Sequence, residues 1–450
     1  MSNRTNSART LLGLVSLAAA VSCFSPGRET FLTPSKDRFS EIKKSVVDLR
    51  GLVLKRDIEI DVRATDRSLS GGRLDDTGAG GAIPITQLEH AYKQLGLIGA
   101  SEDFKTELDK FHRLEQIVYD NGANARLTIT ADAAALGAQL TAPYISAAAE
   151  LPVASGIVQA LQEQHFQWQE KINRTVVEDT RLAYRAIAGG DAMLTALAYA
   201  SDGNLNTPGH ISAARQVSLE MARLARDLPS FLRSQLLLPL QQGSNFVAWA
   251  AKARGRDGVN ALYANPPYTT AQILHPEKYF LVTQTPQRFF PAGLFRLMES
   301  PALLDQSLGE FLLRDLLEPD NSLAAAARIA AGWRGDQLFS FADSDYQTTA
   351  WYSAWGSVDE AASFQRAFQT VAEKRHRIRM RAGKNSDLLI AETRDQGSFA
   401  LARKDNIVLY LITRTARLAA TVEAAWKDLV VEAESEGLRF DSARGPINYR

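Results

Sequence analysis

The sequence predicts an α+β protein in which a mainly helical part precedes a smaller α+β part with an antiparallel or mixed sheet. Residues 152–240 indicate several amphipathic helices, because apolar residues recur every three to four positions between breaks at Gly203, Gly209 and Pro229. Further along, the period changes to alternation, which is typical of strands. Five segments carry this alternation, at 338–341, 348–352, 388–392, 398–401 and 407–412.

The remaining elements follow in chain order. Residues 51–64 alternate apolar and charged positions and predict a strand, and the glycine-rich run at 70–84 predicts a flexible loop. A helical stretch broken at Gly99 is expected from 86 to 119, followed by a short strand at 126–129. The segment at 263–292 is rich in proline and aromatic residues, which predicts an ordered irregular loop. Helices near 358–373 and 413–432 complete the second part.

The charge balance argues against nucleic acid as a partner. The 450 residues hold 51 lysines plus arginines and 51 aspartates plus glutamates, so no global field attracts a polyanion. One local exception is the run at 374–384, KRHRIRMRAGK, where arginines alternate. As a strand it would present one basic face, whereas the plainer interpretation is a solvated surface segment.

The N-terminus has the layout of an export signal that ends at the only cysteine. Arg4 and Arg9 precede an apolar run at 11–21 that is too short to span a membrane as a stable helix. The stretch AVSC at 20–23 resembles a bacterial lipobox, in which the cysteine is diacylated and becomes the mature N-terminus. A lone cysteine has no internal disulfide to form, which favours lipidation of Cys23 over a plain secretory signal.

These observations predict four segments. A signal peptide covers 1–22, and a lipid-anchored tether covers 23–40. A mainly helical domain at 41–320 includes the glycine-rich loop at 70–84, and an α+β module occupies 321–450. The mature body is expected outside the cytoplasm, held by lipid to the cell membrane or outer membrane.

The most informative motif lies on the helix expected to start near Pro152. Residues 155–166 read SGIVQALQEQHF. This segment resembles the metal helix, HELxHALQDQHF, of exported bacterial and archaeal zinc-metallopeptidase-like proteins of gluzincin type. Other matching blocks are QLEHAYKQLGLI at 87–98, AIAGGDAML at 186–194 and AWGSVDEAASF at 354–364. The resemblance implies the fold of that family, with a metallopeptidase-like domain at 41–320.

The zinc chemistry of that family needs two histidines one helical turn apart and a glutamate beside the first. Placed on the family motif, Ser155 and Gln159 stand at the histidine positions, and Gly156 stands at the catalytic glutamate. Gly189 stands where an EGDA-like segment of the family carries its third ligand. Hydroxyl and amide groups are poor zinc ligands, and glycine has no side chain. The resemblance therefore implies that zinc, any other cofactor and peptide hydrolysis by the family mechanism are all absent.

The replacements also predict a change of packing. Glycines at 156, 189 and 190 allow close approach of helices, and either a collapsed groove or a small retained pocket is compatible with them. His165 lies on the apolar stripe of its helix and fits a hydrogen-bonded core histidine better than a ligand. Asp191 is expected to cap or brace a helix.

Two functions remain open at this stage. The first is a catalytically inactive envelope lipoprotein that acts by binding or as a structural component. Its partners would be the membrane, through the lipid anchor, and an envelope protein or peptide. The second is a hydrolase whose chemistry has moved elsewhere around the old cleft, with Ser155, Gln159 and His165 as the nearest candidates.

Overall fold

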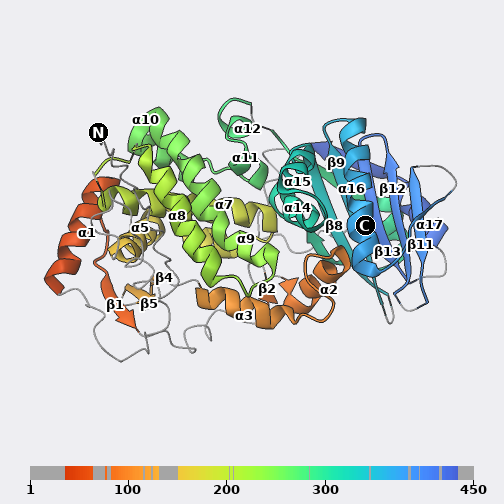
Figure 1. The fold of residues 1–450 in the computed structure, drawn as a ribbon, viewed down its shortest axis with the longest axis horizontal. Helices are drawn as coiled ribbons and strands as arrows, with labels where there is room; N and C mark the ends of the chain where they lie inside the picture. Colours follow the sequence, from red (N-terminus) through yellow and green to blue (C-terminus); the bar gives the residue numbers. More distant parts are fainter. Residues whose placement is uncertain are drawn as a thin grey trace, which may run out of the picture.

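The protein has an α+β fold, with helices gathered on one side and a seven-stranded antiparallel sheet on the other (Figure 1). The computed structural model describes residues 36–63, 77–78, 83–114, 117–122, 125–130, 150–201, 203–205, 207–282, 284–343, 346–383, 387–394, 396–414 and 418–433. Cys23 lies outside these residues. Within them, no helix combines the length and apolarity needed to cross a bilayer.

A three-stranded sheet anchors the first group of helices. Strand β5 (Arg126–Thr130) lies between β1 (Glu59–Arg63), to which it is parallel, and β4 (Ile117–Asp120). Helix α5 (Leu151–Phe166) packs over this sheet, because Ile157 and Leu161 share a buried apolar cluster with Leu127 and Ile129. The same cluster takes residues from α1 (Lys36–Arg50), α7 (Glu178–Tyr199) and α8 (Gly209–Leu224).

The remaining helices connect this group to the large sheet. Most of their buried residues join one apolar core, which also reaches the large sheet. In chain order they are α2 (Ile85–Leu95), α3 (Phe104–Leu114), α6 (Trp168–Arg174), α9 (Ser230–Leu238), the π-helix η4 (Pro239–Gly243), α10 (Ser244–Ala264), α11 (Thr270–Leu274) and α12 (Glu277–Phe280). Helix α13 (Ala292–Met298) belongs to a separate core, to which it contributes Leu294.

The large sheet has the order β10-β11-β12-β13-β9-β8-β7, and neighbours are antiparallel. Alternation of side chains divides its two faces. Trp351 and Tyr410 pack with Phe368 on the side of α16 (Val358–His376), whereas Tyr352 and Leu411 belong to a second core. The strands are β7 (Ala302–Gln306), β8 (Trp333–Asp343), β9 (Tyr346–Trp355), β10 (Arg381–Ala382), β11 (Leu388–Glu392), β12 (Ser398–Lys404) and β13 (Ile407–Thr413).

Short elements complete this half of the molecule. Helices α14 (Gly309–Leu317) and α15 (Leu323–Ala330), joined by the 3-10 turn η5 (Glu318–Asp320), lie between β7 and β8 in the chain. The opposite face is covered by α13 and α17 (Leu418–Trp426). A separate two-stranded sheet pairs β6 (Gln287–Pro291) with β14 (Leu429–Ala433).

The fold class, the five alternating strands and the short strand at 126–129 are confirmed, and several boundaries differ. The helix expected at 413–432 is confirmed only at 418–426. Thr413 is the last residue of a strand, and residues 429–433 pair with β6 as β14. The run at 374–384 is not one basic strand. Its first three residues form the end of α16, and Arg377 after them has a left-handed backbone conformation. Within the run only residues 381–382 form a strand.

Three further observations concern the segments expected from the sequence. Helix α1 begins at Lys36, inside the segment expected to be a tether. Strand β7 joins the large sheet although it precedes residue 321, so the sheet draws on chain from before the expected boundary. Within the glycine-rich run, Thr77–Gly78 pairs with Ile83–Pro84 as β2 and β3, where a loop alone was expected.

Candidate functional site

The positions that correspond to the zinc ligands and the general base of the resembled family lie in tightly packed parts of this protein. Ser155 and Gly156 are both buried on α5. A Cβ atom at Gly156 would lie 2.7 Å from Cδ1 of Leu127 and 3.0 Å from Cγ2 of Ile117. These atoms belong to the three-stranded sheet, so the glycine allows α5 to approach the sheet. A glutamate side chain has no room there.

Gly189 has the same role on α7. A Cβ atom at this position would overlap with Cβ of Pro239, the first residue of η4. One residue on, a Cβ atom at Gly190 would overlap with the backbone of Gly243, at the other end of η4. The close approach of helices expected from these glycines is confirmed for α7 and η4. A carboxylate at 189 would require Pro239 to move.

The four positions therefore do not form a ligand set. Gly156 faces strands and Gly189 faces η4, while Gln159 is half-buried on α5. Among the described residues, no three His, Cys, Asp or Glu side chains gather in a way that could hold a metal ion. The residues present do not fit zinc.

Asp191 braces helices. Its carboxylate accepts hydrogen bonds from Nε of Arg50 at 3.0 Å, from Oη of Tyr263 at 2.6 Å and from Nε2 of Gln162 at 3.1 Å. Burial, together with the neighbouring Asp191 carboxylate, raises the pKa of Tyr263 well above its usual value. The guanidinium of Arg50 also donates to Oδ1 of Asn260 at 2.7 Å. This network ties α1, α5, α7 and α10 together, as the sequence suggested for Asp191.

His165 is hydrogen-bonded and half-buried. Its Nε2 lies 2.7 Å from the carbonyl oxygen of Val53, which can only accept, so Nε2 carries the proton. Ser155 stands ten residues earlier on the same helix, and at 1.5 Å per residue the two lie about 15 Å apart along the axis. The hydroxyl and the imidazole therefore cannot form a catalytic pair.

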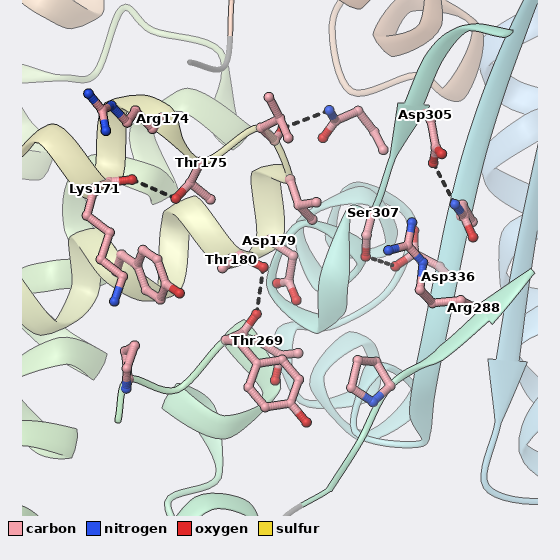
Figure 2. Close-up of a pocket in the computed structure, with 18 of the residues that line it drawn as sticks. Lys171, Arg174, Thr175, Asp179, Thr180, Thr269, Arg288, Asp305, Ser307 and Asp336 are labelled. Carbon is pink, nitrogen blue, oxygen red and sulfur yellow. Dashed lines mark hydrogen bonds between the residues drawn. The ribbon is translucent and has the colours of Figure 1, made fainter. Parts of the chain in front are cut away.

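A different site lies where the helical part meets the large sheet. Here a pocket of about 410 Å³ opens between the start of α7, the loop before α11 and strands β6 to β8 (Figure 2). None of the expected zinc-site positions lines it. Its walls carry charged and aromatic side chains together, among them Lys171, Asp179, Tyr268, Arg288 and Trp333.

Asp336 holds one wall of this pocket in place. Its carboxylate accepts hydrogen bonds from the indole Nε1 atoms of Trp333 and Trp351, at 3.0 and 2.9 Å. It also accepts from Oγ of Ser307 and from the backbone N–H groups of Leu308 and Gly309, each at 2.9–3.0 Å. With five donors the acceptor capacity of this carboxylate is used, so Asp336 positions the start of α14.

Asp179 differs from Asp336, because only one of its two carboxylate oxygens accepts hydrogen bonds among the described residues. Oδ1 accepts hydrogen bonds from the backbone N–H of Thr270, at 3.0 Å, and from its hydroxyl. Oδ2 is buried and has no hydrogen-bond partner among the described residues. Burial raises the pKa of Asp179 well above its usual value despite the Thr270 contacts, and the nearby carboxylates of Asp336 and Glu310 add to this.

The charged residues nearer the surface are already engaged. Arg174 forms an ion pair with Glu170, and Nζ of Lys171 lies 5.2 Å from the ring centre of Tyr184. Asp305 accepts from Nε2 of Gln337 at 2.6 Å, and burial raises its pKa. The pocket therefore carries its one unsatisfied buried carboxylate oxygen at Asp179, within the described residues.

This pocket was missed from the sequence for a physical reason. Asp179 stands in the first turn of a helix, where acidic residues are common because they favour the positive end of the helix dipole. Its special position depends on Thr270, which is distant in the chain, and on Gly309. A Cβ atom at Gly309 would overlap with the carboxylate of Asp179, so this glycine makes room for it.

Comparison with known proteins adds one finding. Residues 299–423 match a domain of unknown function, DUF8575. This segment contains the whole seven-stranded sheet and runs into α17. No curated protein and no solved structure matches the chain. Because the match covers under half of the chain and its description assigns no activity, the similarity to zinc peptidases stays a prediction.

Proposed function

We propose that this protein is a non-catalytic binding protein, held at the membrane by a lipid on Cys23, with the pocket beside Asp179 as its binding site. The observation that carries the proposal is the packing at Gly189 and Gly156. Where the resembled family places a ligand and a general base, this chain has backbone in contact with Pro239, Leu127 and Ile117.

The chemistry of the replaced residues supports the absence of hydrolysis by the family mechanism. A zinc peptidase lowers the pKa of a metal-bound water toward neutrality, and the ligand set must be complete for this. Ser155 and Gln159 supply weak donors, and Gly156 supplies no base. A hydrolase built around the old cleft would need a nucleophile and a base within reach, which the separation of Ser155 and His165 rules out for that pair.

The pocket supports binding in its place. Its volume of about 410 Å³ lies in the range that accommodates small ligands. It is built from both halves of the molecule, and such junctions often hold ligand sites. The proposed export and the equal numbers of acidic and basic residues argue for an envelope ligand or partner and against nucleic acid.

The variant Cys23→Ala tests the anchor and the lack of catalysis together. Without the thiol no lipid can be attached, so we expect the wild-type chain in the membrane fraction and the variant in the soluble fraction. The released variant, incubated with excess zinc and a mixed peptide substrate, should show no cleavage above a protein-free control.

Two outcomes would contradict the proposal. A Cys23→Ala chain that stays in the membrane fraction would show that the lipid is not the anchor. Peptide cleavage that a zinc chelator abolishes would show that a metal site has been rebuilt elsewhere.

A further inference from the structure

Large apolar side chains are exposed where α10 and α12 meet, along the upper edge of the molecule in Figure 1. The ring of Trp249 on α10 stacks on that of Phe280 on α12, with ring centres 6.2 Å apart and planes at 14°. Leu281 and Val282 follow directly and are 74% and 73% exposed, while Trp249 is 51% exposed. Adjacent large apolar side chains left in water mark contact sites for proteins or membranes. We call Trp249, Phe280, Leu281 and Val282 the apolar face.

The turn that carries Leu281 and Val282 is held in place. The backbone N–H groups of both residues donate to the carbonyl oxygen of Glu277, at 3.1 and 3.0 Å. Within α12, Nζ of Lys278 donates at 3.0 Å to the buried carboxylate of Glu310 on α14. The two side chains are therefore presented to solvent from a turn that the fold fixes.

Basic side chains lie beside the apolar face. The segment 244–256 contains three basic residues and no acidic one, and the first of them stands one helical turn after Trp249. All three are exposed, and they are Lys252, Arg254 and Arg256. The exposed acidic residues nearest in the chain are Asp257 and Glu277, so positive charge is in excess.

An anionic lipid surface suits this combination of side chains. Tryptophan favours the boundary between the headgroups and the hydrocarbon of a bilayer, and basic residues beside it attract anionic headgroups. A second copy of the chain suits it less well, because docking the same face on itself would bring like charges together. A lipid on Cys23, as proposed above, would keep the body close to such a surface.

We propose that the apolar face docks on an anionic lipid surface, with Trp249, Leu281 and Val282 entering the boundary below the headgroups and the three basic side chains among them. This inference goes beyond binding in the pocket and rests on the proposed anchor only for nearness to a membrane. A shallow contact of this kind is weak and reversible. It orients an anchored body, and the chain without lipid still enters the soluble fraction.

The lone cysteine of the chain makes a local test possible. In the full chain with Cys23→Ala, the substitution Leu281→Cys supplies the only thiol, which is labelled with a dye whose emission depends on polarity. Vesicles of phosphatidylcholine and phosphatidylglycerol in equal parts are then added. We expect the emission to shift to shorter wavelength and to saturate with lipid, because the labelled position leaves water.

The matched control is Leu297→Cys in the same chain. Leu297 is 41% exposed on α13, which packs against α17 at the end of the molecule away from α10 (Figure 1). We expect no shift there. Both chains contain the apolar run at 11–21, so a shift at Leu281 alone reports the apolar face.

A charge variant tests the basic part of the surface. In the labelled Leu281→Cys chain, Lys252→Gln together with Arg254→Gln should raise the lipid concentration at half-saturation about tenfold or more, since each basic residue near an anionic surface strengthens binding roughly fivefold. Vesicles of phosphatidylcholine alone should bind the parent chain weakly, and the charge variant should not weaken that binding further.

Several results would overturn the inference. These are no shift at Leu281, equal shifts at Leu281 and Leu297, or unchanged affinity in the charge variant. A shift that grows with protein concentration in the absence of vesicles would point to a second copy instead. If the labelled Leu281→Cys chain does not fold, Val282→Cys is the second probe, with the same expected shift. Failure here leaves the proposed anchor and pocket untouched, because the fractionation of Cys23→Ala tests the anchor by itself.

Discussion

At the scale of single residues, three buried aspartates have different roles because their partners differ. Asp191 pairs with Arg50 and joins helices, and Asp336 is saturated by five donors. Asp179 keeps one oxygen without a partner in the described residues and lines a pocket. Residue type and burial are alike in all three, so only the count of hydrogen bonds sets Asp179 apart.

A fourth buried carboxyl makes stability depend on pH. Asp315 on α14 has a pKa raised to about 7, mainly by burial, with Arg314, Arg233 and Ser234 acting in the opposite direction and Glu318 adding to the rise. As pH rises, the Asp315 carboxyl stays protonated to a higher pH in the folded state than in the unfolded state. Stability is therefore lost as pH rises from about 4 to about 7, and the penalty stays in full above that range.

The variant Asp315→Asn removes this penalty. Its gain in free energy of unfolding should be larger at about pH 8 than at about pH 5 by roughly 1–3 kcal/mol, from about 1.4 kcal/mol per pKa unit. Urea unfolding at the two pH values measures it. The control Asp227→Asn alters a carboxyl that is 85% exposed and should give no such difference. A gain that is equal at both pH values would show that ionisation of Asp315 is not the cause.

At the scale of elements, the alternation of apolar residues in strands and their helical periodicity predicted most of the fold. Trp351 and Tyr352 point to opposite cores, as do Tyr410 and Leu411, and this two-residue period made β9 and β13 predictable. Strands β7 and β14 were missed because each is short and is defined by a partner distant in the chain. The glycines of α5 and α7 signalled close packing, but not which element would approach.

Gly189 offers a test in which two effects have opposite signs. In a helix, alanine is normally favoured over glycine by up to about 1 kcal/mol. Here the added Cβ would overlap with Pro239, and overpacking costs about 1–3 kcal/mol. We therefore expect Gly189→Ala to lower the free energy of unfolding, measured by urea titration.

A double-mutant cycle supplies the control. In the background Pro239→Gly the opposing Cβ is gone, so the cost of Gly189→Ala should shrink or change sign. An equal cost in both backgrounds would mean that the contact between α7 and η4 is not its source.

At the scale of the whole molecule, the two halves differ in what is known of them, and both halves line one pocket. The sheet-bearing half matches DUF8575, while for the helical half the similarity of residues 155–166 to a zinc-peptidase helix is a prediction from the sequence. The pocket draws on both, with Asp179 from the helical half and Asp305, Ser307 and Trp333 from the other. Sequence patterns describe each half alone, so a site built by their contact could not be predicted from them.

The central claim of the proposal is that this chain holds no zinc, although residues 155–166 are predicted to resemble a zinc-peptidase helix. The most direct measurement is the zinc content of the full chain after incubation with excess zinc and exhaustive dialysis, by atomic emission spectroscopy. We expect no stoichiometric zinc, because Ser155, Gly156, Gln159 and Gly189 offer no ligand set and the last has no room for a side chain. One tightly bound zinc per chain would contradict the account.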